Sequence, residues 1–269
     1  MMLKKRLIFI LLYNDGQFML SRNFRLQKVG DIKWLQKNYD FAKVSFSIDE
    51  LVVLDVTRGQ RDLKRFCNTL KKISAECFLP IAAGGGISEI RTARDLLLAG
   101  ADKVVLNSAL AESPSFVYNL AQEFGQQCIV ASVDIKLGSD GEFLVFTRNA
   151  TKIINPNASY YLKHIAEQPI GELYLNSIDR DGTGQGLDLQ LLDLLPANFI
   201  QPVILAGGIG NSSHMSSGFL DNRIDAVATA NLLNFIGDGL SNARYELIKE
   251  GFSLATWDLK VLPTLKCEQ

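Results

Sequence analysis

The chain repeats itself, and this repeat constrains the fold more than any local pattern does. Three landmarks of the first half, two strand-like runs and a glycine cluster, recur after 122 or 123 residues. They begin in the two halves at Glu50 and Glu172, at Ala83 and Ala206, and at Asp102 and Asp225. The sequence therefore predicts one structural unit that has been duplicated, with halves over about 4–125 and 126–250.

Short apolar runs alternate with amphipathic segments along both halves. Runs rich in Val, Ile and Leu with helices between them are typical of a parallel sheet buried on both faces. Eight strands in a two-fold repeat of 269 residues favour a (β/α)8 TIM barrel, an α/β fold, over an open doubly wound sheet. We expect the strands near 6–13, 50–55, 79–83, 103–107, 128–134, 171–177, 201–206 and 225–230.

No linker rich in Pro, Gly or Ser divides the halves, so we expect a single domain over 1–269. Residues 251–269 fall outside the repeat as a tail with no assigned role. Helices are expected over Ile90–Ala99 and Pro114–Phe124. Asp-Gly pairs follow the first and fifth strands, and each predicts a small hairpin at the barrel rim.

The composition argues against several classes of function. With 28 basic and 29 acidic residues, the net charge of -1 gives no reason to expect a nucleic-acid partner. Four cysteines without CxxC spacing indicate reduced thiols rather than a disulfide or zinc site. His164 and His214, the two histidines, have no partner at ligand spacing, so we expect neither a metal nor another cofactor. No apolar run reaches the roughly 18 residues of a membrane span, which predicts a soluble, cytoplasmic protein.

Glycine clusters end the third and seventh strands, at the barrel end where βα loops gather. Glycine lets the backbone approach an anion, and a helix that follows offers free N–H groups. Two copies related by the repeat favour two phosphate sites on opposite sides of the mouth, although single clusters also suit plain tight turns. The candidate residues are Gly85, Gly86, Asn107, Ser108, Gly182, Gly207, Gly208 and Asn231.

Asp134 ends the fifth strand, where a barrel enzyme would place an acid or a base. The same carboxylate also suits a strand-end cap or a bond that orders a loop. Asp179 and Asp181 follow the sixth strand in an Asp-Gly context that also suits a turn, and we take Asp134 and Asp181 as catalytic candidates. The repeat sets Asp134 against Leu12, so one half ends its first strand in a carboxylate and the other in a hydrocarbon.

A second group of charges falls at the opposite ends of the strands. Such residues are often solvated at the bottom of a barrel, a face that usually serves stability. Because their signs alternate around the ring, they also suit a salt-bridged plug across the barrel axis. These residues are Arg6, Glu50, Lys103 and Glu172.

Six segments resemble the cyclase subunit of imidazole glycerol phosphate synthase, and the likeness runs from about residue 4 to about residue 250. They are Lys5–Ile8, Asp49–Asp55, Gly84–Ile87, Gly100–Val104, Asp140–Thr147 and Ser177–Thr183. The resemblance implies a duplicated half-barrel whose class I glutaminase partner docks on the N-terminal face and releases ammonia. It also implies that ammonia crosses a charged gate and the barrel interior to a bisphosphate substrate, where two aspartates act as acid and base.

When the family's functional residues are matched to positions of this chain, some are present and others are replaced. It implies that the gate residues are Arg6, Glu50, Lys103 and Glu172, that Asp102 lies at the glutaminase interface, and that Asp134 is the second catalytic aspartate. The first catalytic aspartate falls on Leu12, a lysine of the following loop on Leu20, and two serines of the second phosphate site on Ala206 and Asn231.

Leucine can neither donate nor accept a proton, and a positioned acid or base typically contributes about 10²–10⁴-fold in rate. The leading hypothesis is therefore a subunit that binds a glutaminase and passes ammonia to a different consumer. By analogy with family members in surface-polysaccharide pathways, that consumer is a sugar amidotransferase. The first alternative is an authentic cyclase of histidine biosynthesis that relies on Asp134 and Asp181. The second is a regulatory module whose phosphate sites hold a phosphorylated small molecule.

Overall fold

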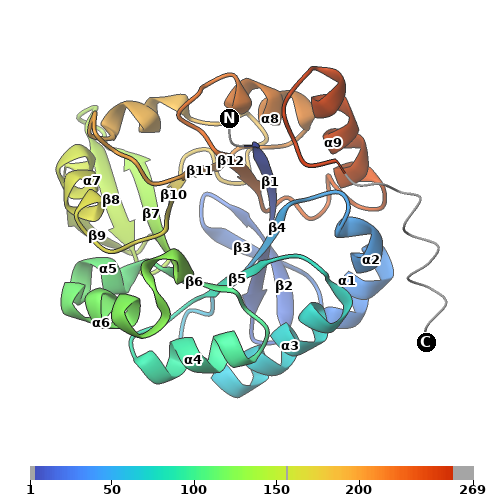
Figure 1. Ribbon diagram of the computed structural model, residues 1–269, viewed down its shortest axis with the longest axis horizontal. Helices are drawn as coiled ribbons and strands as arrows, with labels where there is room; N and C mark the ends of the chain where they lie inside the picture. The colour runs from blue at the N-terminus through green and yellow to red at the C-terminus, as the bar shows by residue number, and fades with distance from the viewer. Residues whose placement is uncertain (1–3, 156, 257–269) are drawn as a thin grey trace.

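The computed structural model describes residues 4–155 and 157–256, and its centre is a closed barrel of eight parallel strands (Figure 1). The pairing of β7 with β10 closes the ring, which confirms the predicted TIM barrel. In order around the ring, the strands are β1 (Arg6–Asn14), β4 (Glu50–Asp55), β5 (Ile81–Gly84), β6 (Lys103–Leu106), β7 (Ile129–Leu137), β10 (Glu172–Ser177), β11 (Val203–Ala206) and β12 (Ala226–Thr229).

Helices surround the barrel; most lie in the connections between successive strands, and α9 follows the last strand, β12 (Figure 1). The predicted helices at 90–99 and 114–124 correspond to α4 and α6. The α-helices are α1 (Ile32–Asn38), α2 (Phe41–Val44), α3 (Leu63–Glu76), α4 (Ile90–Leu98), α5 (Ser108–Glu112), α6 (Pro114–Phe124), α7 (Ala158–Ala166), α8 (Ser212–Phe219) and α9 (Gly239–Lys249). Over residues 4–155 and 157–256 there are also two 3-10 helices, η1 (Gln126–Cys128) and η2 (Leu189–Leu194), and η2 follows β10 in place of an α-helix. No described helix combines the length and apolar composition that crossing a membrane requires.

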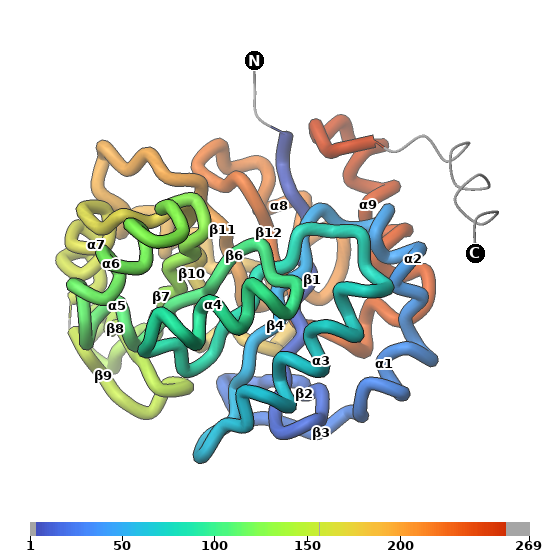
Figure 2. Tube along the Cα trace, turned by 60° about the horizontal axis from the view of Figure 1, so that its bottom comes forward, coloured from blue at the N-terminus to red at the C-terminus, as the bar shows by residue number. Residues whose placement is uncertain are grey.

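Both predicted hairpins form, and each continues into a further strand. After β1, the chain turns at Asp15-Gly16 into β2 (Gln17–Arg22) and β3 (Arg25–Gly30). After β7 it forms β8 (Phe143–Thr147) and β9 (Lys152–Asn155) in the same antiparallel manner. Figure 2 shows the β2–β3 hairpin at the opposite end of the barrel from the start of β1. Most of the predicted tail, 257–269, lies outside the described residues.

Alternation along the strands divides their side chains between two cores. In β1, Leu7, Phe9 and Leu11 pack in the large cluster shared with the helices. Ile8, Ile10 and Leu12 belong to a second cluster, which lines the barrel axis. The inward position of each strand residue is therefore fixed by its parity, and the same rule places the residues of the candidate site.

A buried ion pair holds the last helix against the N-terminal end of the barrel. Arg244 of α9 donates two hydrogen bonds of 2.9 Å to the two carboxylate oxygens of Asp49, the residue before β4. Only 5% of the Arg244 side chain and 10% of the Asp49 side chain are exposed. Asp49 also accepts the backbone N–H of Leu7, so the pair links α9 to two neighbouring strands.

Arg244→Ala should destabilise the protein by about 3 kcal/mol, because removing one partner leaves a buried carboxylate uncompensated. The measurement is the free energy of unfolding in urea. Arg94→Ala is the control, since its pair with Glu123 is about half exposed. That substitution should cost less than about 1 kcal/mol. Equal losses in the two variants would contradict the structural role given to the Asp49–Arg244 pair.

Candidate functional site

A cavity of about 710 Å³ lies over the barrel axis at the C-terminal ends of the strands. Side chains from both halves of the barrel line it, together with residues of the β2–β3 hairpin. It brings together many of the predicted site residues, namely Leu12, Gly85, Gly86, Asn107, Ser108, Asp134 and Asp181. The two halves of the barrel thus contribute different side chains to one chamber at the mouth.

Asp134 lies on β7 with 8% of its surface exposed. Its two carboxylate oxygens accept hydrogen bonds from Asn176 Nδ2 at 3.0 Å and Asn107 Nδ2 at 3.1 Å. Burial raises the pKa of Asp134 to about 7, an effect that the Asn176 bond opposes and the charge of Asp181 reinforces. A carboxyl group with a pKa near neutrality is suited to exchanging protons at physiological pH.

Asp181 lies close to Asp134 but its carboxylate is occupied by the hairpin above the mouth. Its Oδ2 accepts the Ser21 hydroxyl at 2.5 Å and the Phe24 backbone N–H at 2.9 Å. Burial raises the pKa of Asp181, and these two bonds lower it. Asp181 therefore orders the β2–β3 hairpin over the cavity, and a catalytic role for it remains a prediction.

Leu12 faces Asp134 across the barrel, since β1 and β7 are four strands apart in a ring of eight. The leucine is 8% exposed and packs in the apolar cluster on the axis with Met19 of β2. No carboxylate therefore stands at the end of β1 on the cavity wall. The resemblance implies two catalytic aspartates facing each other across the mouth. Of these two, the chain has only Asp134.

The first glycine cluster forms a turn beside β5. Gly85 and Gly86 both have positive φ, +116° and +68°. A Cβ on Gly85 would lie 2.2 Å from the Asp55 carbonyl oxygen, so packing alone requires glycine at this position. The guanidinium of Arg61 lies over Gly86, where a Cβ would come within 2.8 Å of it. Among the described residues, the amide N–H groups of this turn have no backbone acceptor, and with Arg61 they suit an anion.

Asn107 is predicted to offer its side-chain N–H groups to a phosphate at this turn, but those groups have other partners. Its side-chain N–H groups donate to the Ser132 carbonyl oxygen at 3.0 Å and to Asp134. The amide is therefore engaged in holding the Asp134 carboxylate. Ser108 remains at the N-terminus of α5 on the cavity wall.

The second glycine cluster borders a smaller cavity of about 180 Å³ that adjoins the first. Two arginines of the hairpin, Arg22 and Arg25, supply positive charge on its wall. As in the first turn, packing requires glycine, because a Cβ on Gly208 would lie 2.1 Å from the Gly186 carbonyl oxygen. The predicted phosphate residues on this wall are Gly182, Gly207, Gly208 and Asn231.

The four charged residues that open strands meet at the other end of the barrel axis. Arg6 Nη1 lies 3.0 Å from Glu50 Oε2 and 3.0 Å from Glu172 Oε1. Lys103 Nζ lies 3.0 Å and 3.1 Å from the same two oxygens. Each cation therefore bridges both carboxylates, and the four side chains form a closed ring rather than four separate solvated charges.

This ring is buried enough for its charges to depend on one another. Glu50 is 2% exposed, and burial raises its pKa, while the charge of Lys103 lowers it. Within the described chain, Glu50 Oε1 and Glu172 Oε2 are buried without a hydrogen-bond partner. Removing either cation would thus leave uncompensated negative charge on the axis.

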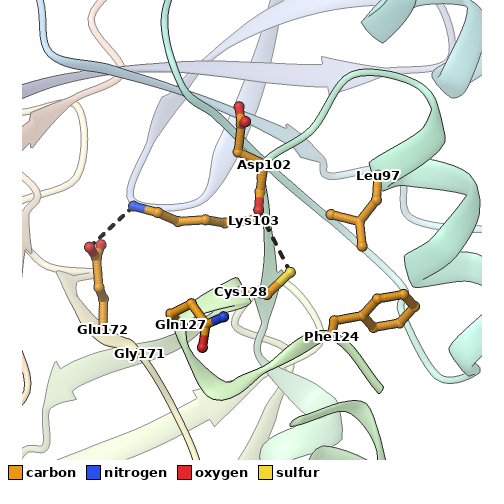
Figure 3. Close-up of a pocket in the computed structure, with 8 residues that line it drawn as sticks. All are labelled: Leu97, Asp102, Lys103, Phe124, Gln127, Cys128, Gly171 and Glu172. Atoms are coloured by element: carbon orange, nitrogen blue, oxygen red, sulfur yellow. Dashed lines mark hydrogen bonds and ion pairs between the residues drawn. The ribbon is translucent and has the colours of Figure 1, made fainter. Parts of the chain in front are cut away.

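Asp102 lies beside the ring at a hollow of about 540 Å³ on the N-terminal face (Figure 3). In this view Lys103 points toward Glu172, and Phe124 and Leu97 line the far side of the hollow. The Asp102 carboxylate accepts the Ile81 backbone N–H at 2.8 Å, so it also ties two strands together. A role for Asp102 at a protein interface remains a prediction.

Several residues of the mouth escaped the sequence analysis. Asn176 and Ser21 hold the two aspartates, and Arg61 lies over the first glycine turn. No sequence motif marks them, because each acts through a contact with a residue far away in the chain. Within the described residues, no group of three or more His, Cys, Asp or Glu side chains could hold a metal ion.

Comparison with known proteins shows which family the chain is similar to. A family model described as histidine biosynthesis protein matches residues 26–237. A protein of Parasynechococcus marenigrum with the provisional name imidazole glycerol phosphate synthase subunit hisF2 is 44% identical over 259 residues, 96% of each chain. The imidazole glycerol phosphate synthase subunit HisF of Chlorobaculum tepidum is 34% identical over 254 residues, which cover 94% of this chain and 99% of that protein.

The raised pKa of Asp134 predicts a pH dependence of stability. The folded state keeps this proton up to about pH 7, whereas an unfolded aspartate loses it near pH 4. The stabilisation is therefore complete below about pH 4 and is lost as the pH rises toward about 7. Asp134→Asn should remove this loss, which is measured as the free energy of unfolding at a series of pH values.

Asp140→Asn is the control, because Asp140 is an exposed carboxylate at the turn between β7 and β8. That variant should keep the pH dependence of the natural protein. If Asp134→Asn and the natural protein lost stability in parallel between pH 4 and pH 7, the pKa given to Asp134 would be wrong.

Proposed function

The chain belongs to the histidine biosynthesis protein family as a HisF-like cyclase-subunit homologue. From this premise we propose that it binds a class I glutaminase and conducts ammonia through its barrel to a different enzyme. The acceptor enzyme in this proposal is a sugar amidotransferase of surface-polysaccharide biosynthesis. The cyclase reaction itself is impaired.

One contrast supports this proposal above all others. At the N-terminal end of the axis, the ring of Arg6, Glu50, Lys103 and Glu172 is complete, with four contacts of 3.0–3.1 Å. At the C-terminal end, Leu12 occupies the position across from Asp134. A chain that keeps the ammonia gate but lacks one of the two proton-transferring groups suits ammonia conduction better than the cyclase reaction.

The interior between these ends is suited to a small neutral molecule. Above the ring, the axis is lined by the apolar side chains of Ile8, Val52, Ala82, Val130 and Ala226. Moving ammonium through such surroundings would cost the desolvation of a charge, whereas neutral ammonia carries no such penalty. Because the ring closes the axis, at least one of its ion pairs must separate for ammonia to enter.

The docking surface in this proposal is the N-terminal face around the hollow of Figure 3. Leu97 and Phe124 offer partly buried apolar surface there, beside the exposed Gln127. A glutaminase seated on this face would release ammonia next to Lys103 and Glu172, two ring members that line the hollow.

The authentic cyclase is the second candidate, and one observation favours it. Asp134 has a pKa of about 7 and lies in a chamber of about 710 Å³ whose first glycine turn suits a phosphate. Such a site would retain one half of the acid–base machinery. The regulatory module, a third candidate, shares this observation and needs no chemistry at all.

The test uses the cognate glutaminase and sugar amidotransferase together with the barrel. Glutamine labelled with ¹⁵N in its side-chain amide is supplied beside an excess of unlabelled ammonium. Conduction through the barrel predicts amidated sugar that carries mostly ¹⁵N, because ammonia does not mix with the solvent. Gln127→Arg should lower glutaminase binding by at least about tenfold and abolish the enrichment, since it places bulk and charge at the rim of the hollow.

Asn68→Arg is the matched control, because Asn68 is an exposed residue of α3 on the flank of the barrel. It should leave both binding and labelling unchanged. Product labelled only in proportion to the free ammonium would contradict conduction. Glutaminase binding unaffected by Gln127→Arg would contradict docking on this face.

A further inference from the structure

The two sides of the mouth differ in polarity, and this difference is seen by comparing residues at equivalent positions of the repeat. Inward residues of β1 and β4 that line the chamber are hydrocarbons, whereas the residues 122 positions later, on β7 and β10, are polar. The pairs are Ile10 with Ser132, Leu12 with Asp134, and Leu54 with Asn176. Three hydrocarbons on one side thus face a hydroxyl, a carboxyl and an amide on the other.

The hydrocarbons form a continuous surface, here called the apolar wall. Leu12 and Leu54 are direct neighbours in the register of β1 and β4. The β2–β3 hairpin extends the wall over the chamber, and Val56 extends it beyond β4. The wall consists of Ile10, Leu12, Phe24, Leu26, Leu54 and Val56.

The wall does not serve only as packing for the hairpin. Asp181 already holds the hairpin through Ser21 and Phe24, and a chamber of about 710 Å³ remains beneath it. Leu26 and Leu54 pack against the axial cluster while remaining only partly buried. Apolar surface that lines a chamber of this size favours a ligand that displaces water from it.

The anion-binding turn lies directly beside the wall. Leu54 of β4 pairs in register with Gly84 of β5, and the Gly85–Gly86 turn with Arg61 over it follows at once. A ligand whose phosphate occupies this turn can extend toward β4 and β1, along hydrocarbon. On its other flank lie Asn176 and the carboxyl of Asp134.

We propose that the mouth binds an organic phosphate with two different sides. An apolar group next to the phosphate packs on the wall, and hydrogen-bonding groups face Asp134 and Asn176. A uniformly hydroxylated sugar phosphate fits this chamber poorly, because its hydroxyls would lose water against Leu12 and Leu54 without gaining partners. This inference concerns the ligand alone and does not depend on ammonia conduction.

The test compares three probes by calorimetric titration of the full chain: inorganic phosphate, ribose 5-phosphate and phenyl phosphate. Burial of an aromatic ring on the wall predicts that phenyl phosphate binds about tenfold or more tightly than either of the others. Leu26→Asn should remove most of this preference while leaving inorganic phosphate unchanged. Leu12→Asn, which copies the polar character of the other half, should act in the same way.

Leu137→Asn is the matched control, because Leu137 is likewise a leucine of a hairpin, 45% exposed, but does not line this chamber. It should leave all three affinities unchanged. Leu26 lies on the hairpin outside the barrel strands, so its variant keeps the test valid if Leu12→Asn fails to fold. Equal or tighter binding of ribose 5-phosphate, no binding of any probe, or an equal loss for all three probes in Leu26→Asn would each overturn the proposal.

Discussion

Closure of eight parallel strands into a ring is the constraint on which the rest of this structure depends. Once β7 pairs with β10, parity along each strand decides which side chains reach the axis. Arg6 and Glu50 are inward because they stand two residues before Ile8 and Val52, which are inward as well. The ring of charges, the apolar interior and the mouth are therefore successive layers of one alternating pattern.

Duplication and function act on different parts of this pattern. The outward layers keep the repeat, since they must pack on helices in both halves. The inward layers near the mouth depart from it, with Leu12 and Leu54 on one side and Asp134 and Asn176 on the other. Two halves of the same architecture thus present a hydrocarbon surface and a hydrogen-bonding surface to the same chamber.

The sequence located all eight strands, because buried parallel strands are nearly continuous in apolar residues and because each one is repeated. Errors at the ends have a local cause: the strands predicted from 79 and 201 begin at Ile81 and Val203, after prolines that lack an N–H to donate. The roles of Asn107 and Asp181 could not be predicted, because they depend on side-chain contacts with residues 27 and 160 positions away in the chain. The charged ring was open to prediction, since its members occupy equivalent strand starts.

Cyclase turnover by the purified barrel is the most direct measurement of whether Leu12 removes the family's chemistry. The assay supplies the family's ribulosyl bisphosphate substrate and ammonium at high pH, with HisF of Chlorobaculum tepidum as reference. We expect no turnover above background from the natural chain and a measurable gain from Leu12→Asp, which restores a carboxylate across from Asp134. Turnover by the natural chain at the rate of the reference protein would contradict the loss of that chemistry.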